Sequence, residues 1–158
     1  MAKNANGAAL APARWMALLV PAALLGGAYI SQYVFGLFPC EMCWWQRYAH
    51  FAALGFAALA FAMPRQRAPI MLAALAIGVS ALIGAYHAGV EYHWWEGVTH
   101  CTSTAASGGD PLAAIMNAPL IRCDVAQWTL MGVSLAGFNF LLSGAGALTV
   151  VNFLRRSQ

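Results

Sequence analysis

Charged residues are scarce in this chain. They make up 8% of its 158 residues, against about 25% in an average globular protein. So few charges cannot cover a water-facing surface, which argues against a soluble domain and favours lipid as the surrounding solvent. The net charge of +3 is also too small to predict a nucleic-acid partner.

The motifs of several common enzyme classes are also missing. The chain contains no phosphate-binding glycine motif, no paired catalytic carboxylates and no serine-histidine constellation. We therefore do not expect nucleotide-dependent chemistry, or hydrolysis by those mechanisms.

Apolar residues, at 61% of the chain, take the place of charge. A helix of about 20 apolar residues crosses a bilayer, and backbone in lipid must satisfy its own hydrogen bonds, which favours helices. We therefore predict an all-α membrane protein, a four-transmembrane-helix bundle that forms one domain over residues 1–158. Pro21 is expected to kink the first span. The predicted spans are about 15–31, 44–63, 68–88 and 128–151, and the loops on one side are about 32–43 and 89–127.

The positions of the charges predict an orientation. All five acidic residues fall on the side of the two long loops, whereas six of the eight basic residues fall on the other side. Because positive charge is retained in the cytoplasm, both termini are expected there, and the two loops are expected in the periplasm of a bacterial inner membrane. The six basic residues are Lys3, Arg14, Arg65, Arg67, Arg155 and Arg156.

All four cysteines fall in the two predicted periplasmic loops. Cys40 and Cys43 lie in the first, and Cys101 and Cys123 lie in the second. Disulfides persist on this side of the membrane. One pair in each loop is therefore the simplest interpretation, and a disulfide that closes the second loop would either be structural or be open to attack by a protein partner.

The first pair has the spacing of a redox motif, Cys40-Glu41-Met42-Cys43. Cys43 is expected at the start of the second helix, where the partial positive charge stabilises a thiolate. Arg47 follows one helical turn later and would stabilise the thiolate further. Two alternatives remain open, a purely structural disulfide and a zinc site. A zinc site needs four ligands, and the second cysteine pair is not close in sequence, so no metal is predicted.

Taken together, these features resemble the disulfide bond formation protein B (DsbB) family over nearly the whole chain. The resemblance rests on four spans, on the segment from Cys40 to Arg47, on the loop pair Cys101 and Cys123, and on His87 at the end of the third span. It implies a quinone-dependent thiol:disulfide oxidoreductase. Such a protein reoxidises a periplasmic thioredoxin-fold oxidase similar to DsbA and reduces ubiquinone or menaquinone.

The resemblance also implies roles by position. The partner attacks Cys101 to form a mixed disulfide, the released Cys123 attacks Cys40, and Cys43 leaves as a thiolate that engages the quinone. Arg47 stabilises the thiolate and the charge that develops on the quinone, and His87 lies near the ring. Two positions depart from the family pattern. Gln46 stands where many members carry an acidic residue, and Tyr86 stands where many carry arginine.

Two rival functions and one further residue remain open. A quinone reductase of the vitamin K epoxide reductase type would share the chemistry, although that family usually has its C-x-x-C near the end of a late helix. A non-catalytic membrane protein with two structural disulfides is the other alternative. His50 shares a helical face with Cys43, so it could face the quinone or bond to a neighbouring helix.

Overall fold

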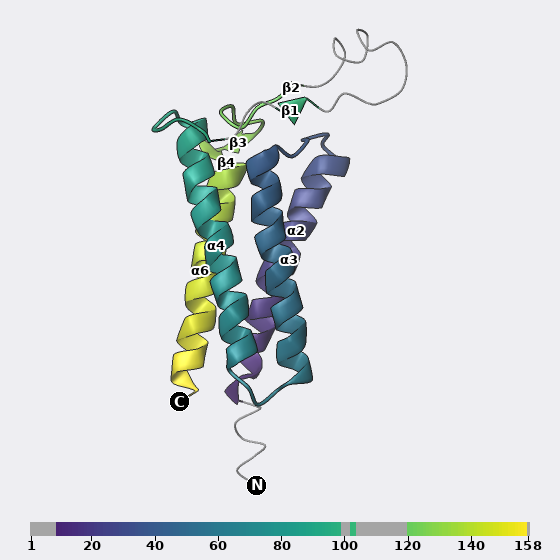
Figure 1. Cartoon of the computed structure of the whole chain (residues 1–158), viewed down its shortest axis with the longest axis vertical. Coiled ribbons are helices and arrows are strands. Elements are labelled where there is room, and N and C mark those ends of the chain that lie inside the picture. Colours follow the sequence, from purple (N-terminus) through teal and green to yellow (C-terminus); the bar gives the residue numbers. More distant parts are fainter. Residues whose placement is uncertain (1–8, 99–101, 104–119, 158) are drawn as a thin grey trace.

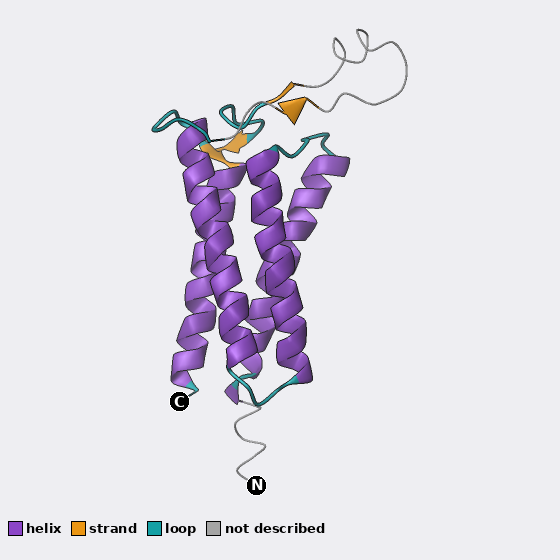
Figure 2. Cartoon of the chain, viewed as in Figure 1, coloured by secondary structure: helices purple, strands orange, loops and turns teal. Residues whose placement is uncertain are grey.

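Figure 1 shows the structure, a computed structural model that describes residues 9–98, 102–103 and 120–157. These residues are mostly helical, as predicted. Figure 2 shows the helices side by side, with two short strand pairs at one end. The four long helices are α2 (Ala11–Tyr33), α3 (Glu41–Ala62), α4 (Ala68–Glu91) and α6 (Leu135–Arg156).

Three of the described helices, α2, α4 and α6, are long and apolar enough to cross a membrane. Helix α3 is as long as α6, but its first half carries Gln46, Arg47 and His50. These three side chains are buried inside the bundle, whereas Phe51 and Leu59 of the same helix are exposed. The low apolarity of α3 therefore comes from a polar face that is turned inward.

Small side chains fill the core, and large apolar side chains face outward. Leu75, Leu82 and Leu148, for example, are between 59% and 72% exposed. Small residues in a helix interface let backbones approach closely in lipid, and an outward apolar surface suits lipid rather than water. The core far from the strands consists of Leu10, Ala13, Ala17, Ala57, Ala60, Ile70, Ala73, Ala74, Val150 and Leu154.

Helix α2 continues without a break through Pro21, which is buried. It crosses the bundle obliquely, so that in Figure 1 its end near Tyr33 lies beside α3 on the side away from α4. The helix therefore packs less closely on α4 than α3 and α6 do.

The predicted fourth span began too early, at residue 128. Strands β3 (Thr129–Leu130) and β4 (Val133–Ser134) form an antiparallel hairpin there, and α6 begins only at Leu135. The turn residues Met131 and Gly132 both have positive φ, 51° and 79°, as a two-residue hairpin turn requires. The Oγ of Ser134 then accepts a hydrogen bond from the backbone of Gly137 at 3.1 Å and caps the helix.

The other strand pair joins the two sides of the long second loop. Strand β1 (Thr102–Ser103) pairs antiparallel with β2 (Leu120–Ile121). Cys101 lies outside the described residues, and so does most of the predicted loop segment between the two strands.

The segment after α4 folds back over the end of that helix. The indole of Trp95 donates a hydrogen bond to the backbone oxygen of Tyr86 at 2.9 Å and stacks on its ring, and the Tyr86 hydroxyl donates to the backbone of Glu96 at 3.0 Å. This close approach needs Gly89, because a Cβ there would overlap the Trp95 ring. Tyr86, one of the departures from the family pattern, therefore holds the folded-back segment against α4.

Candidate redox site

Cys40 is the N-cap of α3, which corrects the expected position of the helix start. Its backbone is extended, and its Sγ accepts a hydrogen bond from the backbone N–H of Cys43 at 3.4 Å. The helix begins at Glu41, so Cys43 lies inside its first turn. Both sulfurs therefore lie at the positive end of the helix dipole, and the cap position favours Cys40 as much as Cys43.

The two sulfurs of the C-x-x-C motif are close but not bonded. Both residues are thiols here, with the Sγ atoms 3.1 Å apart. A disulfide has an S–S distance of about 2 Å, so closure requires a movement of only about 1 Å. Cys40 is buried, with 2% exposed, and Cys43 is half-buried.

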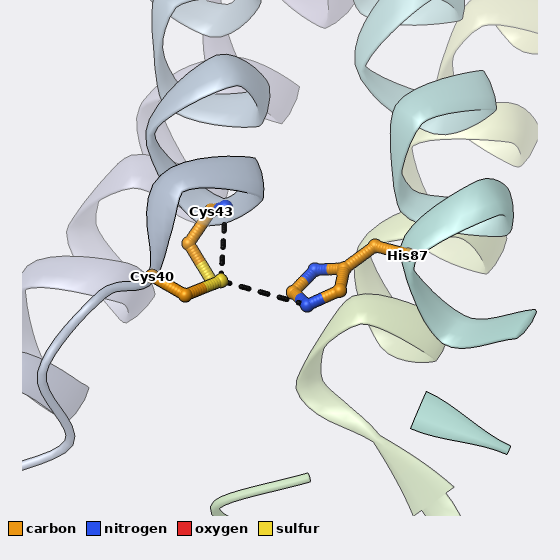
Figure 3. Close-up of side chains that lie close together, drawn as sticks. All are labelled: Cys40, Cys43 and His87. Atoms are coloured by element: carbon orange, nitrogen blue, oxygen red, sulfur yellow. Dashed lines mark hydrogen bonds between the residues drawn. The ribbon is translucent and has the colours of Figure 1, made fainter. Parts of the chain in front are cut away.

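His87 of α4 lies beside this pair. Figure 3 shows its ring directed at Cys40. Its Nε2 atom lies 3.5 Å from the Cys40 Sγ. The same nitrogen lies 3.7 Å from Oε1 of Glu91, one turn further along α4. The structure thus brings the predicted histidine to the cysteine at the helix cap.

A buried polar network extends from His87 into the bundle. Gln46 bonds His87 at 3.0 Å, Asn139 bonds Gln46 at 2.7 Å, and Asn139 bonds His50 at 2.9 Å. Ser80 and Ser143 also bond to this network. Of these residues, Asn139, Ser80 and Ser143 were not singled out from the sequence. The available signal was the presence of polar side chains inside otherwise apolar helices, which are costly in lipid unless they are paired.

Arg47 is held against α2. Its guanidinium donates to Oε1 of Gln32 at 2.6 Å and to the backbone oxygen of Ala28 at 3.2 Å. Its Cζ lies 4.9 Å from the ring centre of Tyr29 and 5.0 Å from that of Trp44, so the charge is enclosed between two aromatic rings. These contacts fix the cation in place, and Arg47 is buried, with 6% exposed.

Cys123 joins the same region from the second loop. It is 8% exposed and packs in one buried cluster with Cys40, Met42, Val90 and Ile121. Three of the four cysteines are thus gathered at one end of the bundle, and the fourth, Cys101, lies outside the described residues.

The residues on either side of Cys123 form an ion pair. The guanidinium of Arg122 donates to both carboxylate oxygens of Asp124, to Oδ1 at 2.8 Å. These hydrogen bonds lower the pKa of the Asp124 carboxyl to about 2. The pair therefore stays charged at neutral pH.

An apolar cavity of about 410 Å³ opens between α2, α3 and α6. Leu24, Leu25 and Leu142 are part of its apolar wall, and Cys43 and Arg47 line it as well. Ligand sites of small molecules are commonly cavities of about 300–1,000 Å³ with a few polar groups in an apolar wall. The other polar side chains of the wall include Cys40, Gln46, His50, His87, Glu91 and Asn139.

Cys40, Cys43 and His87 could in principle hold a metal ion, because one ligand atom of each lies within 4.8 Å of the others. The hydrogen bonds oppose this. The Gln46 amide nitrogen faces Nδ1 of His87, which keeps the ring proton on Nε2, the nitrogen that faces the sulfurs. A metal ligand needs a bare nitrogen there. The absence of a metal stays a prediction.

Comparison with known proteins gives a consistent result. The sequence model of the family "Disulfide bond formation protein DsbB" matches residues 11–153. A disulfide bond formation protein B of Acidovorax sp. (strain JS42) is 31% identical over 147 residues, which cover 83% of this chain and 80% of the relative. The protein of the same name from Verminephrobacter eiseniae is 30% identical and covers 92% of this chain and 87% of the relative. No solved structure matches significantly.

The family match and the three apolar helices have two consequences. The chain is a multi-pass membrane protein, and the names of its relatives imply an oxidoreductase role in disulfide formation. Because the family model covers most of the sequence, this chain belongs to the DsbB family of disulfide bond formation proteins.

Proposed function

We propose that this protein is a quinone-dependent thiol:disulfide oxidoreductase of the bacterial inner membrane, which reoxidises a periplasmic thioredoxin-fold oxidase similar to DsbA. The observation that carries the proposal is the meeting of Cys40, Cys43 and Cys123 beside an apolar cavity whose wall contains Arg47. A purely structural pair of disulfides would not need a buried histidine or an enclosed cation beside it.

Helix α3 is the fourth span in this proposal. Its outer surface is apolar and its polar side chains are turned inward. The start of α2 and the end of α6 lie at the end of the bundle opposite the strands, which supports cytoplasmic termini and periplasmic cysteines. At that end Arg67 of the α3–α4 connection donates to the backbone oxygen of Leu154 at 2.7 Å.

The cysteines pass electrons in four thiol–disulfide exchanges. A thiolate of the partner attacks Cys101 in the Cys101–Cys123 disulfide, which forms a mixed disulfide and releases the Cys123 thiolate. Cys123 then attacks Cys40 in the Cys40–Cys43 disulfide and releases the Cys43 thiolate. The partner's second thiolate resolves the mixed disulfide, and Cys101 displaces Cys40 from Cys123. The second loop returns to its disulfide, and Cys40 and Cys43 are left reduced.

The packing of Cys123 with Cys40 supports the second exchange, because the attacking sulfur starts in the same buried cluster as its target. The position of Cys43 in the first turn of α3 supports its role as the leaving thiolate. Both requirements are met at the end of the bundle where the second loop lies.

The cavity fits a quinone in size and in the character of its wall. When the Cys40–Cys43 dithiol closes to a disulfide it releases two electrons and two protons, for which a quinone held there would be the acceptor. Cys43, Arg47 and His87 line the cavity and would hold the ring. Arg47 presents a fixed positive charge, and the apolar wall keeps water away from the exchange.

The test follows quinone absorbance with purified protein and two electron donors, a reduced DsbA-like protein and a small dithiol. We expect Cys101→Ser to lose reduction by the protein donor and to retain reduction by the small dithiol, which can reach the first pair directly. Cys43→Ser should lose both. Quinone reduction by Cys43→Ser with either donor would contradict the proposal.

A further inference from the structure

The hydrogen-bond directions in the buried network can be fixed from the backbone. The Nδ2 group of Asn139 lies 3.1 Å from the backbone oxygen of Ser80, which can only accept. This end of the Asn139 amide is therefore the donor. It donates at 2.7 Å to Gln46, so the Gln46 atom that faces it is the acceptor Oε1.

The other end of the Gln46 amide is then also fixed. Its Nε2 lies 3.3 Å from the backbone oxygen of Met42, a second acceptor, and 3.0 Å from Nδ1 of His87. An amide NH₂ group only donates, so Nδ1 of His87 must present its lone pair. The neutral ring then carries its proton on Nε2.

That proton is directed at the reactive pair. Figure 3 shows the His87 ring pointing at Cys40. The Nε2 atom lies 3.5 Å from Sγ of Cys40 and 3.7 Å from Oε1 of Glu91. We propose that Gln46 and Asn139 are positioning residues that hold His87 in the Nε2–H tautomer, so that it donates a hydrogen bond to the Cys40 sulfur. The reactivity of Cys40 itself rests on the proposed function.

The consequence is that the sulfur of Cys40, and not that of Cys43, receives this additional hydrogen bond. Cys40 receives the His87 hydrogen bond in addition to the backbone N–H of Cys43 at the helix cap, and donors of this kind stabilise a thiolate. His87 acts as a donor and not as a base, because a second proton on Nδ1 would face the Gln46 NH₂ group. An acidic residue at position 46 would accept from Nδ1 and reverse this arrangement.

The test is nitrogen NMR of histidine side chains in the purified full-length chain, labelled with ¹⁵N-histidine, in detergent with the cysteines reduced. We expect His87 in the Nε2–H tautomer in the unaltered protein, with assignment by loss of its signal in His87→Asn. Gln46→Glu should move the ring proton to Nδ1 or protonate both nitrogens. Asn139→Leu, which is similar in volume, should give a mixture of tautomers because the Gln46 amide is released.

Ser143→Ala is the matched control. Ser143 bonds Asn139 at its Oδ1, the end of the amide away from Gln46, so this change should leave the His87 tautomer as it is. The Ser143→Ala variant also shows whether the chain stays folded when one residue of the network is replaced. A His87 proton on Nδ1 in the unaltered protein, or an unchanged tautomer in both Gln46→Glu and Asn139→Leu, would overturn the proposal.

A second readout measures the sulfur. In a Cys43→Ser background, we expect Asn139→Leu to slow alkylation of Cys40 by iodoacetamide by about fivefold, the factor that one ordinary hydrogen bond represents. An unchanged alkylation rate would show that the tautomer does not act on Cys40. Neither readout uses a quinone, so failure of quinone reduction and failure of this inference are separate results.

Discussion

Replacement of Gly84 by alanine tests how closely α4 and α6 pack beside the candidate site. A Cβ at this position would lie 3.0 Å from the backbone oxygen of Ala136, from Nδ2 of Asn139 and from the backbone nitrogen of Phe140. Two of these atoms belong to the backbone of α6 and cannot rotate away. Helix α6 must therefore move outward by a few tenths of an ångström, and the Asn139 amide must shift with it.

The expected cost follows from this overlap. Overpacking of a close interface destabilises by about 1–3 kcal/mol, whereas alanine in place of glycine favours a helix by up to about 1 kcal/mol. Gly78→Ala is a matched control, because Gly78 lies in the same helix and has no atom within 4 Å of its Cβ position. The control carries only the favourable helix term. Gly84→Ala should therefore be less stable than Gly78→Ala by about 1–3 kcal/mol.

The assay is reversible unfolding of both variants in mixed micelles with increasing sodium dodecyl sulfate, followed by circular dichroism. The difference between their free energies of unfolding isolates the packing effect, since the helix term is common to both. Equal free energies of unfolding would refute the close packing of α4 on α6 at Gly84.

Three further predictions concern the end of the bundle that carries the strands, and the cavity. Gly89→Ala should displace Trp95 from α4, because the new Cβ overlaps the Trp95 ring, and tryptophan fluorescence should report the change. Gly144→Ala is the control, because it has open space at its Cβ position, and it should leave the spectrum unaltered. Tyr92→Phe removes the hydrogen bonds to Gly132 and Ser134 and should cost about 1–3 kcal/mol of stability; a cost near zero in the same unfolding assay would show that these bonds are not needed. Arg47→Lys keeps the charge but cannot reproduce both hydrogen bonds of the guanidinium. The KM for the quinone should therefore rise by about tenfold, and the KM for the protein partner should not change. A rise in the KM for the partner alone would contradict the proposed role of Arg47.

The sequence was sufficient for features that depend on composition and spacing. Long apolar segments predicted the helices, and the C-x-x-C motif directed attention to Cys40 and Cys43. The structure places His87 and Arg47 in the wall of the cavity, and their contact with a quinone stays a prediction. Apolar segments and the C-x-x-C spacing are local features, because they depend only on residues that are near one another in the sequence.

Features that depend on contacts between helices were not predictable in the same way. Asn139 on α6 was not singled out from the sequence, because its partners Gln46 and Ser80 lie on α3 and α4. The hairpin before α6 was read as helix because its residues are apolar, whereas its turn depends on the positive φ of Gly132. The cap position of Cys40 rests on one helix boundary, which apolar pattern alone does not define.

The most direct test of the central claim is a single turnover. The protein is fully reduced, freed of reductant and mixed with excess quinone, and the absorbance of the oxidised quinone is followed. If the Cys40–Cys43 dithiol delivers the electrons, Cys101→Ser and Cys123→Ser should each still reduce one quinone per chain, and Cys43→Ser should reduce none. Loss of the turnover in Cys123→Ser, or its survival in Cys43→Ser, would contradict the account.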